Sequence, residues 1–161
     1  MSARRALLLP LALCLLATGA AAQLRDWAVV CQAESEGEGM RCQMSQTLLE
    51  PGTGETILSL VIRPSPDGAG LSMLMALPHG LDLAAGVRFD IDGADAGAAP
   101  FQTSDRNGVY VALPLPEPAV DAMRAGNAFN VRVTTLQGEE AEIPASLLGF
   151  TAAVARLARE E

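Results

Sequence analysis

The sequence contains no lysine, one histidine, one tryptophan and one tyrosine among its 161 residues. All 11 basic residues are arginines, and 19 acidic residues outnumber them, which gives a net charge of −8. Nucleic acids and anionic lipid headgroups attract positively charged surfaces. This charge balance therefore argues against a nucleic-acid-binding function.

The chain also lacks an apolar run of the roughly 20 residues that cross a bilayer as a helix. Its apolar run at residues 6–17 follows Arg4 and Arg5 and precedes three alanines that end at Ala22. A positive start, a short apolar stretch and small residues at the cleavage point are typical of a secretory signal peptide. We therefore predict a signal peptide over residues 1–22 and a released periplasmic protein with no membrane span.

Cysteine is scarce as well. Cys14 lies in the predicted signal peptide, so the exported chain keeps Cys31 and Cys42. A pair of cysteines in an oxidising compartment predicts a disulfide. Redox couples favour the close Cys-x-x-Cys spacing, which this pair does not have, so we interpret the bridge as structural.

The rest of the chain consists of short apolar segments with a period of two residues, separated by glycine, proline and acidic residues. This pattern predicts an antiparallel sheet. In the segment 56–63 apolar residues fall on both faces, which is typical of a central strand covered on both sides. We expect strands at 27–31, 40–48, 56–63, 71–77, 87–91, 98–102, 109–113, 129–134 and 141–143, with turns at Asp92-Gly93 and Asn107-Gly108.

Two short helices complete the expected elements. The first spans about 118–125, with proline in its first turn and Gly126 just past its end. The second spans about 148–159 and carries an apolar stripe. We therefore predict one all-β domain over residues 23–161, an antiparallel β-sandwich with one or two short helices, including a C-terminal helix. We expect a core that includes Trp27, Leu58, Leu60, Ile62, Met73, Met75, Phe89, Val131, Val133 and Phe150.

Several short motifs occur in a characteristic order along nearly the whole exported chain. They are Asp26-Trp27-Ala28-Val29-Val30-Cys31, Arg41-Cys42-Gln43-Met44-Ser45-Gln46, Leu77-Pro78-His79-Gly80, Phe89-Asp90-Ile91-Asp92-Gly93 and Pro144-Ala145-Ser146-Leu147-Leu148-Gly149-Phe150. In this order they resemble the invasion-associated locus B family of exported bacterial proteins. The resemblance covers about residues 26–157.

The resemblance implies a periplasmic or surface-associated protein, linked in some pathogens to host-cell invasion, and implies no known reaction, cofactor or catalytic residue. The sequence departs from the family in two places. Many members carry a second cysteine pair in the stretch corresponding to 101–111, which has none here. His79 also replaces the second leucine of a Leu-Pro-Leu-Gly motif. Neither departure threatens the fold, and family membership alone does not fix function.

Three glutamates, Glu34, Glu36 and Glu38, lie in the loop that the disulfide would close. Such a loop is commonly a solvated tip, but loops on rigid scaffolds often carry binding residues. We predict that these glutamates form a recognition element for another protein, whose surface could be basic. The sequence does not specify the oligomeric state.

Two alternative functions rest on weaker patterns. The first is a hydrolase using His79, the single histidine, although no Gly-x-Ser-x-Gly or Ser-x-x-Lys motif supplies a nucleophile. The second is a metal-handling protein that would hold copper through Met73, Met75 and His79, or calcium through Asp90, Asp92 and Asp95. Core packing explains the methionines and an Asp-Gly turn explains the aspartates, so we assign no catalytic residue, metal ligand or cofactor.

Overall fold

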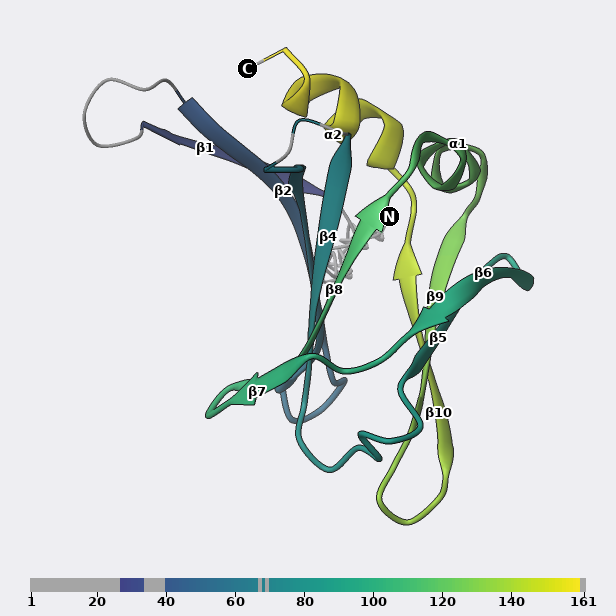
Figure 1. The fold of residues 1–161 in the computed structure, drawn as a ribbon. Coiled ribbons are helices and arrows are strands. Elements are labelled where there is room, and N and C mark those ends of the chain that lie inside the picture. The colour runs from purple at the N-terminus through teal and green to yellow at the C-terminus, as the bar shows by residue number, and fades with distance from the viewer. Residues whose placement is uncertain (1–26, 34–39, 67, 69, 160–161) are drawn as a thin grey trace, which may run out of the picture.

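The computed structural model describes residues 27–33, 40–66, 68 and 70–159. These residues form two sheets and two helices, arranged as in Figure 1. The strands are β1 (Ala28–Ala33), β2 (Met40–Leu49), β3 (Thr56–Pro64), β4 (Leu71–Leu77), β5 (Val87–Ile91), β6 (Ala94–Ala99), β7 (Thr103–Asp105), β8 (Gly108–Leu115), β9 (Ala128–Thr134) and β10 (Glu140–Ser146). The helices are α1 (Glu117–Ala125) and α2 (Phe150–Leu157).

Every strand pairing is antiparallel, as predicted. The large sheet has the strand order β1-β2-β3-β4-β8-β7, and the small sheet has the order β10-β9-β5-β6. Neighbouring strands are thus mostly consecutive in the chain, because short turns join them. The predicted all-β fold with a C-terminal helix is confirmed.

The core lies between the sheets, where alternate residues of each strand point inward. In β3, for example, Leu58, Leu60 and Ile62 are fully buried while Ile57 and Val61 are only partly buried. The expectation that β3 is central is correct, but the expected second cover over its outer face is absent from the described residues. All ten residues predicted to be in the core are buried: Trp27, Leu58, Leu60, Ile62, Met73, Met75, Phe89, Val131, Val133 and Phe150.

Helix α2 closes one end of the sandwich beside β1 and β2 (Figure 1). It begins at Phe150 rather than at the predicted residue 148, because Gly149 has a left-handed backbone with φ of 83°. The rings of Phe150 and Trp27 pack edge to face, with centroids 5.3 Å apart and an angle of 73° between their planes. This contact packs the residue before β1 against the first residue of α2.

Helix α1 ends at Gly126, as predicted, but for a different reason. Gly126 has a φ of −83°, so it does not supply the left-handed turn that often ends helices. A Cβ atom at this position would lie 2.4 Å from the Ile91 side chain and 3.1 Å from that of Leu147. Glycine is therefore required here by close packing against β5 and the chain that follows β10.

The prediction was wrong around residues 94–105. The return strand β6 runs over Ala94–Ala99 instead of 98–102, because the two-residue turn at Asp92-Gly93 leads directly into it. Asp92 and Gly93 have φ of 51° and 86°, the combination that tight hairpins need. The short strand β7 was missed, since its segment Thr-Ser-Asp carries no apolar residue. The predicted signal peptide lies outside the described residues.

Candidate functional site

The first hairpin extends past the sandwich as an arm (Figure 1). Strand β1 pairs with β2 from Met40 to Ser45, whereas β3 pairs with β2 only from Met44 onward. Residues 30–33 and 40–43 therefore form a two-stranded ribbon, with no third strand beside it among the described residues. We call these eight residues the arm. Two-stranded ribbons are marginally stable by themselves, so this segment needs further support.

The disulfide supplies that support. Cys31 and Cys42 are directly opposite each other in the arm and are bonded, with their Cα atoms 4.0 Å apart. The predicted bridge is thus confirmed. Cys42 is 2 % exposed and belongs to the hydrophobic core. The bridge therefore links the arm to the core on its inner face, beside α2.

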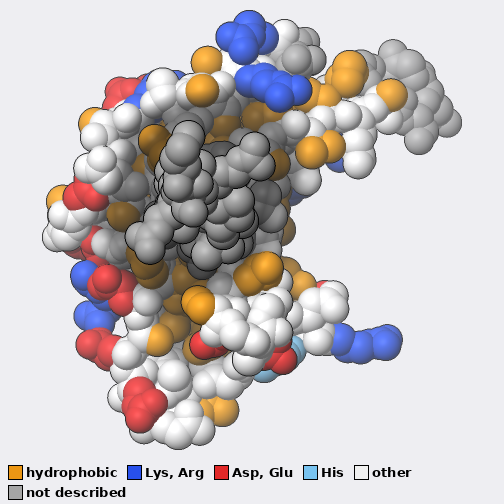
Figure 2. Space-filling model, turned by 180° about the vertical axis from the view of Figure 1, so that it is seen from behind, with side chains coloured by type: hydrophobic (Ala, Val, Ile, Leu, Met, Phe, Trp, Pro, Cys, Tyr) orange, Lys and Arg blue, Asp and Glu red, His pale blue; other side chains and the backbone are white. Residues whose placement is uncertain are grey.

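Apolar side chains of the arm remain exposed. Val30 is 47 % exposed and Met40 is 50 % exposed, whereas Met44, farther along β2, is fully buried. Figure 2, which views the molecule from behind, shows hydrophobic side chains along the arm at the upper right. The predicted recognition residues Glu34, Glu36 and Glu38 lie outside the described residues, in the segment that joins the two strands of the arm.

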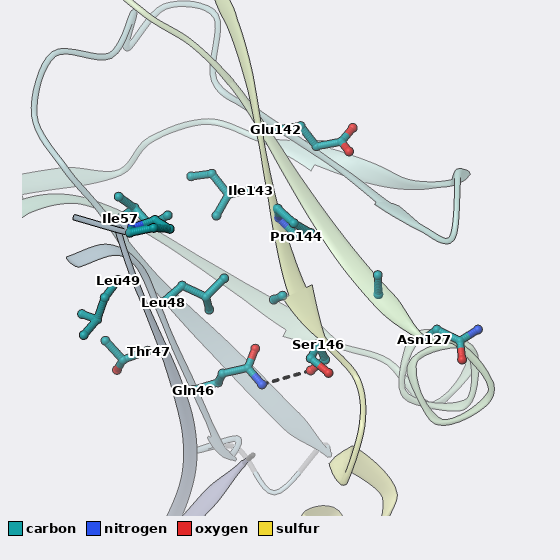
Figure 3. Close-up of a pocket in the computed structure, with 13 residues that line it drawn as sticks. Gln46, Thr47, Leu48, Leu49, Ile57, Asn127, Glu142, Ile143, Pro144 and Ser146 are labelled. Carbon is teal, nitrogen blue, oxygen red and sulfur yellow. Dashed lines mark hydrogen bonds between the residues drawn. The ribbon is translucent and has the colours of Figure 1, made fainter. Parts of the chain in front are cut away.

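A second candidate is a pocket of ≈ 560 Å³ between the two sheets. Leu48 and Ile57 of the large sheet lie across it from Ile143 of the small sheet (Figure 3). At its inner end the Gln46 side chain donates a 3.0 Å hydrogen bond to the Ser146 carbonyl oxygen. This lining is mainly apolar, so the pocket offers space between the sheets rather than a convergent group of reactive side chains.

The same carbonyl oxygen accepts a second hydrogen bond. The indole N–H of Trp27 donates to Ser146 over 3.0 Å. Residues from the start of β1, the middle of β2 and the end of β10 thus meet at one acceptor. This junction holds the base of the arm to the small sheet, and no feature of the sequence pattern indicated it.

Asp90 is a buried carboxylate in β5 with a structural environment. Its Oδ1 accepts hydrogen bonds from the Asn130 side chain at 2.8 Å and from the Gly93 amide at 2.7 Å. Its Oδ2 lies 2.9 Å from the Arg132 guanidinium. The Asn130 hydrogen bond, more than any other contact, holds the pKa of Asp90 below its usual value, and the Gly93 amide and Arg132 act in the same direction against burial.

Asp92 joins the β5–β6 turn to the start of β9. Its carboxylate accepts hydrogen bonds from the Asn127 and Ala128 backbone amides, both at 2.9 Å. These amides lower the pKa of Asp92. Two aspartates of the calcium-like motif therefore organise a turn and a strand entry, and the third, the exposed Asp95, accepts a hydrogen bond from the Gly97 amide within β6. Among the described residues, no group of three or more His, Cys, Asp or Glu side chains is placed to hold a metal ion.

The residues of the other alternative functions occupy ordinary positions. His79 is exposed in the bend that follows β4. Met73 and Met75 are 1 % and 0 % exposed in the core of the large sheet, next to the buried Leu77. The structure therefore places both methionines where core packing explains them, and it adds no observation in favour of copper binding or hydrolysis.

Together, the two antiparallel sheets, the disulfide-tied arm and the terminal helix define a disulfide-bonded β-sandwich protein. Within the described residues no helix is long and apolar enough to cross a membrane. The sequence model of the family described as Invasion associated locus B (IalB) protein matches residues 27–158. The chain therefore belongs to this family.

Known proteins of this kind support the assignment. The chain is similar to two invasion protein B homologs of Brucella abortus, one from strain 2308 and one from biovar 1 strain 9-941. Each is 29% identical over 134 residues, which cover 83% of this chain and 76% of the homolog. Its fold is similar to the crystal structure of invasion associated protein b from Bartonella henselae, with a TM-score of 0.71 and 22% sequence identity over 83% of this chain and 90% of that one.

Proposed function

We propose that this chain is an exported, non-enzymatic interaction protein of the periplasm or the outer surface that binds another protein through the arm and the acidic segment that joins its strands. The observation that carries the proposal is the arm itself. It extends past the sandwich, a disulfide fixes its two strands, and it exposes Val30 and Met40. Rigid scaffolds that present an exposed segment are typical of binding proteins.

The chemistry of the arm suggests what the partner offers. Val30 and Met40 supply apolar contact area, and methionine adapts to irregular surfaces. Glu34, Glu36 and Glu38 follow directly in the sequence and add negative charge. Such a combination suits a partner with an apolar patch beside basic residues, where the charges raise the association rate and orient the complex. The names of the relatives, which refer to invasion, are compatible with a binding role.

Photo-crosslinking in the native host tests the proposal. A photoreactive residue is placed at Met40, which is 50 % exposed on the β2 strand of the arm, and, as a matched control, at Leu136, which is 70 % exposed in the β9–β10 turn. We expect one protein other than this chain, identified by mass spectrometry, to link to position 40 and not to position 136. We also expect the variant E34Q/E36Q/E38Q to reduce this product severalfold. Equal products from both positions, or an unchanged product from the neutral variant, would contradict the proposal for the arm or for its acidic segment respectively.

A further inference from the structure

The described part of the fold has four edge strands, and they differ in how they are protected. A free edge strand presents unpaired backbone N–H and C=O groups to which another strand can add. Natural proteins block such edges with proline, charged side chains, bulges or very short strands. The edges here are β1 and β7 of the large sheet and β10 and β6 of the small sheet.

Three of these edges are blocked. The outward side of β10 includes Pro144, which has no N–H, and the Ser146 carbonyl, which already accepts two hydrogen bonds. Strand β6 faces a register shift in β5 and contains Gly97 with φ of 112°. Strand β7 has three residues. These strands also carry acidic residues: Glu140, Glu142, Asp95 and Asp105.

Strand β1 has none of these features. Its six residues, Ala-Val-Val-Cys-Gln-Ala, include no proline, glycine or charged side chain, and its register with β2 has no shift. Among the described residues β1 pairs only with β2. In a chain with a net charge of −8, it is the one described edge that carries no carboxylate.

The disulfide reveals which backbone groups of β1 face outward. Directly opposed residues of an antiparallel pair have Cα atoms about 5.5 Å apart where they exchange hydrogen bonds and about 4.5 Å apart where they do not. The Cα atoms of Cys31 and Cys42 are 4.0 Å apart, so this pair exchanges none. The N–H and C=O groups of Cys31, and by alternation those of Val29 and Ala33, therefore point away from β2.

These outward groups are arranged symmetrically about Cys31, which means that β1 is complementary to itself. If two copies pair antiparallel with Cys31 opposite the second copy's Cys31, then Val29 lies opposite the second copy's Ala33. Every outward N–H then meets an outward C=O. On the outer face, Val30 lies beside the second copy's Gln32, so exposed apolar surface is covered and no like charges are opposed.

We propose that β1 is a strand-addition edge whose occupant is a second copy of this chain, so that two large sheets join through a two-fold axis at Cys31. Two-fold pairing of identical surfaces is the usual way in which homodimers form. The inference concerns the β1 edge of the arm, including Val30, and leaves Met40 of β2 and the acidic segment to the partner proposed above. The two proposals are therefore tested by separate experiments.

Disulfide trapping tests the register with the oxidised mature chain. In the proposed pairing, position 30 of one copy directly faces position 32 of the other at a non-hydrogen-bonded site, where Cα atoms lie closest. We expect a mixture of V30C and Q32C chains to yield a covalent dimer under oxidising conditions, with the 30–32 bond and the native Cys31–Cys42 bond both found by non-reducing peptide mapping. Each single variant alone, whose cysteines are out of register, should give several-fold less.

A second variant tests the backbone bonds. Ala33→Pro removes an outward N–H from an exposed position at the end of β1 and leaves the bonds to β2 intact. Ala33→Ser, which keeps the N–H, is the control. In sedimentation over a concentration series, we expect the wild type and Ala33→Ser to form the dimer with similar dissociation constants. We expect the dissociation constant of the Ala33→Pro dimer to be roughly tenfold higher or more than that of the wild type. A monomer at all concentrations, or a dimer that shows neither the trapped bond nor sensitivity to Ala33→Pro, would overturn the proposal.

Discussion

Two hairpins, one in each sheet, are held together by different means. In the arm, β1 and β2 have no third strand beside them in the described part of the chain, and a disulfide joins them. In the small sheet, the β9–β10 hairpin is flanked by β5, and Arg132 of β9 pairs with Glu142 of β10 at 2.7 Å. Covalent support thus occurs where neighbours are few, and polar cross-strand pairs suffice where a third strand adds packing.

The largest effect is expected at the base of the arm. Phe150 is fully buried and contacts Trp27, so Phe150→Ala would leave a cavity where α2 meets the arm. We expect the free energy of unfolding to fall by about 3–5 kcal/mol. Denaturant titration measures it, and Thr151→Ala, at an exposed neighbouring position, is the control. A loss no larger than that of the control would show that the contact between Trp27 and Phe150 does not stabilise the fold.

The second effect concerns the covalent bond. The C31S/C42S variant removes a bridge between residues 11 apart in sequence. The entropy of the unfolded chain alone predicts a loss of about 3 kcal/mol. In hydrogen exchange, amides of β1 and β2 should lose more protection than those of β9 and β10, because the arm has no third strand. Wild type in reductant should match the variant, and uniform loss of protection in both hairpins would contradict the comparison.

The two hairpins also differed in how well the sequence predicted them. Alternating apolar residues located β2 to β5 and β9 within a residue or two, and a pair of cysteines in a chain predicted to be exported was sufficient to predict the bridge. Periodicity reports burial, however, and not which strands are neighbours. That the arm extends past β3 therefore could not be deduced, since it depends on where the β2–β3 register begins.

Polar contacts that join distant segments were equally hidden. The Ser146 carbonyl oxygen accepts hydrogen bonds from the Trp27 and Gln46 side chains. Because it is a backbone atom, its role depends on how three distant segments meet and not on residue type. The aspartates of the Asp-x-Asp-Gly motif were correctly assigned to a turn, but the contact of Asp90 with Arg132 of β9 was not foreseen. Residue types show what a side chain can bind, whereas tertiary structure decides what it meets.

A third, smaller effect tests the polar support of the small sheet. Asp90→Asn keeps the shape of the side chain but removes its negative charge. In the wild type the charged carboxylate pairs with Arg132 and accepts a hydrogen bond from the Asn130 side chain. We expect a loss of about 1–2 kcal/mol at neutral pH, measured by denaturant titration, because hydrogen bonds to charged groups are stronger than neutral ones. Glu55→Gln, at an exposed position, should change little.

The same variant predicts a pH dependence with a definite sign. The folded pKa of Asp90 lies below its usual value of 3.8, so the folded state favours the ionised carboxylate. Its contribution is therefore complete above the unfolded pKa, near 4, and is lost as the pH falls through the lower folded value. Wild type should lose more stability than Asp90→Asn between neutral pH and this acid range. If the free energies of unfolding of the two proteins changed in parallel with pH, Asp90 would have the same pKa in the folded and unfolded states.

The smallest effect is expected for an exposed ion pair in the small sheet. Arg88 of β5 contacts Glu140 of β10, and their side chains are 61% and 68% exposed. Pairs so open to solvent contribute about 0–1 kcal/mol, and added salt screens them. A double-mutant cycle with Arg88→Ala and Glu140→Ala should give a coupling energy below about 0.5 kcal/mol at physiological salt. A larger coupling energy that resists salt would mean that the small sheet depends on its surface ion pairs as the arm depends on its disulfide. The two regions would then differ in the type of bond that supports them and not in its strength.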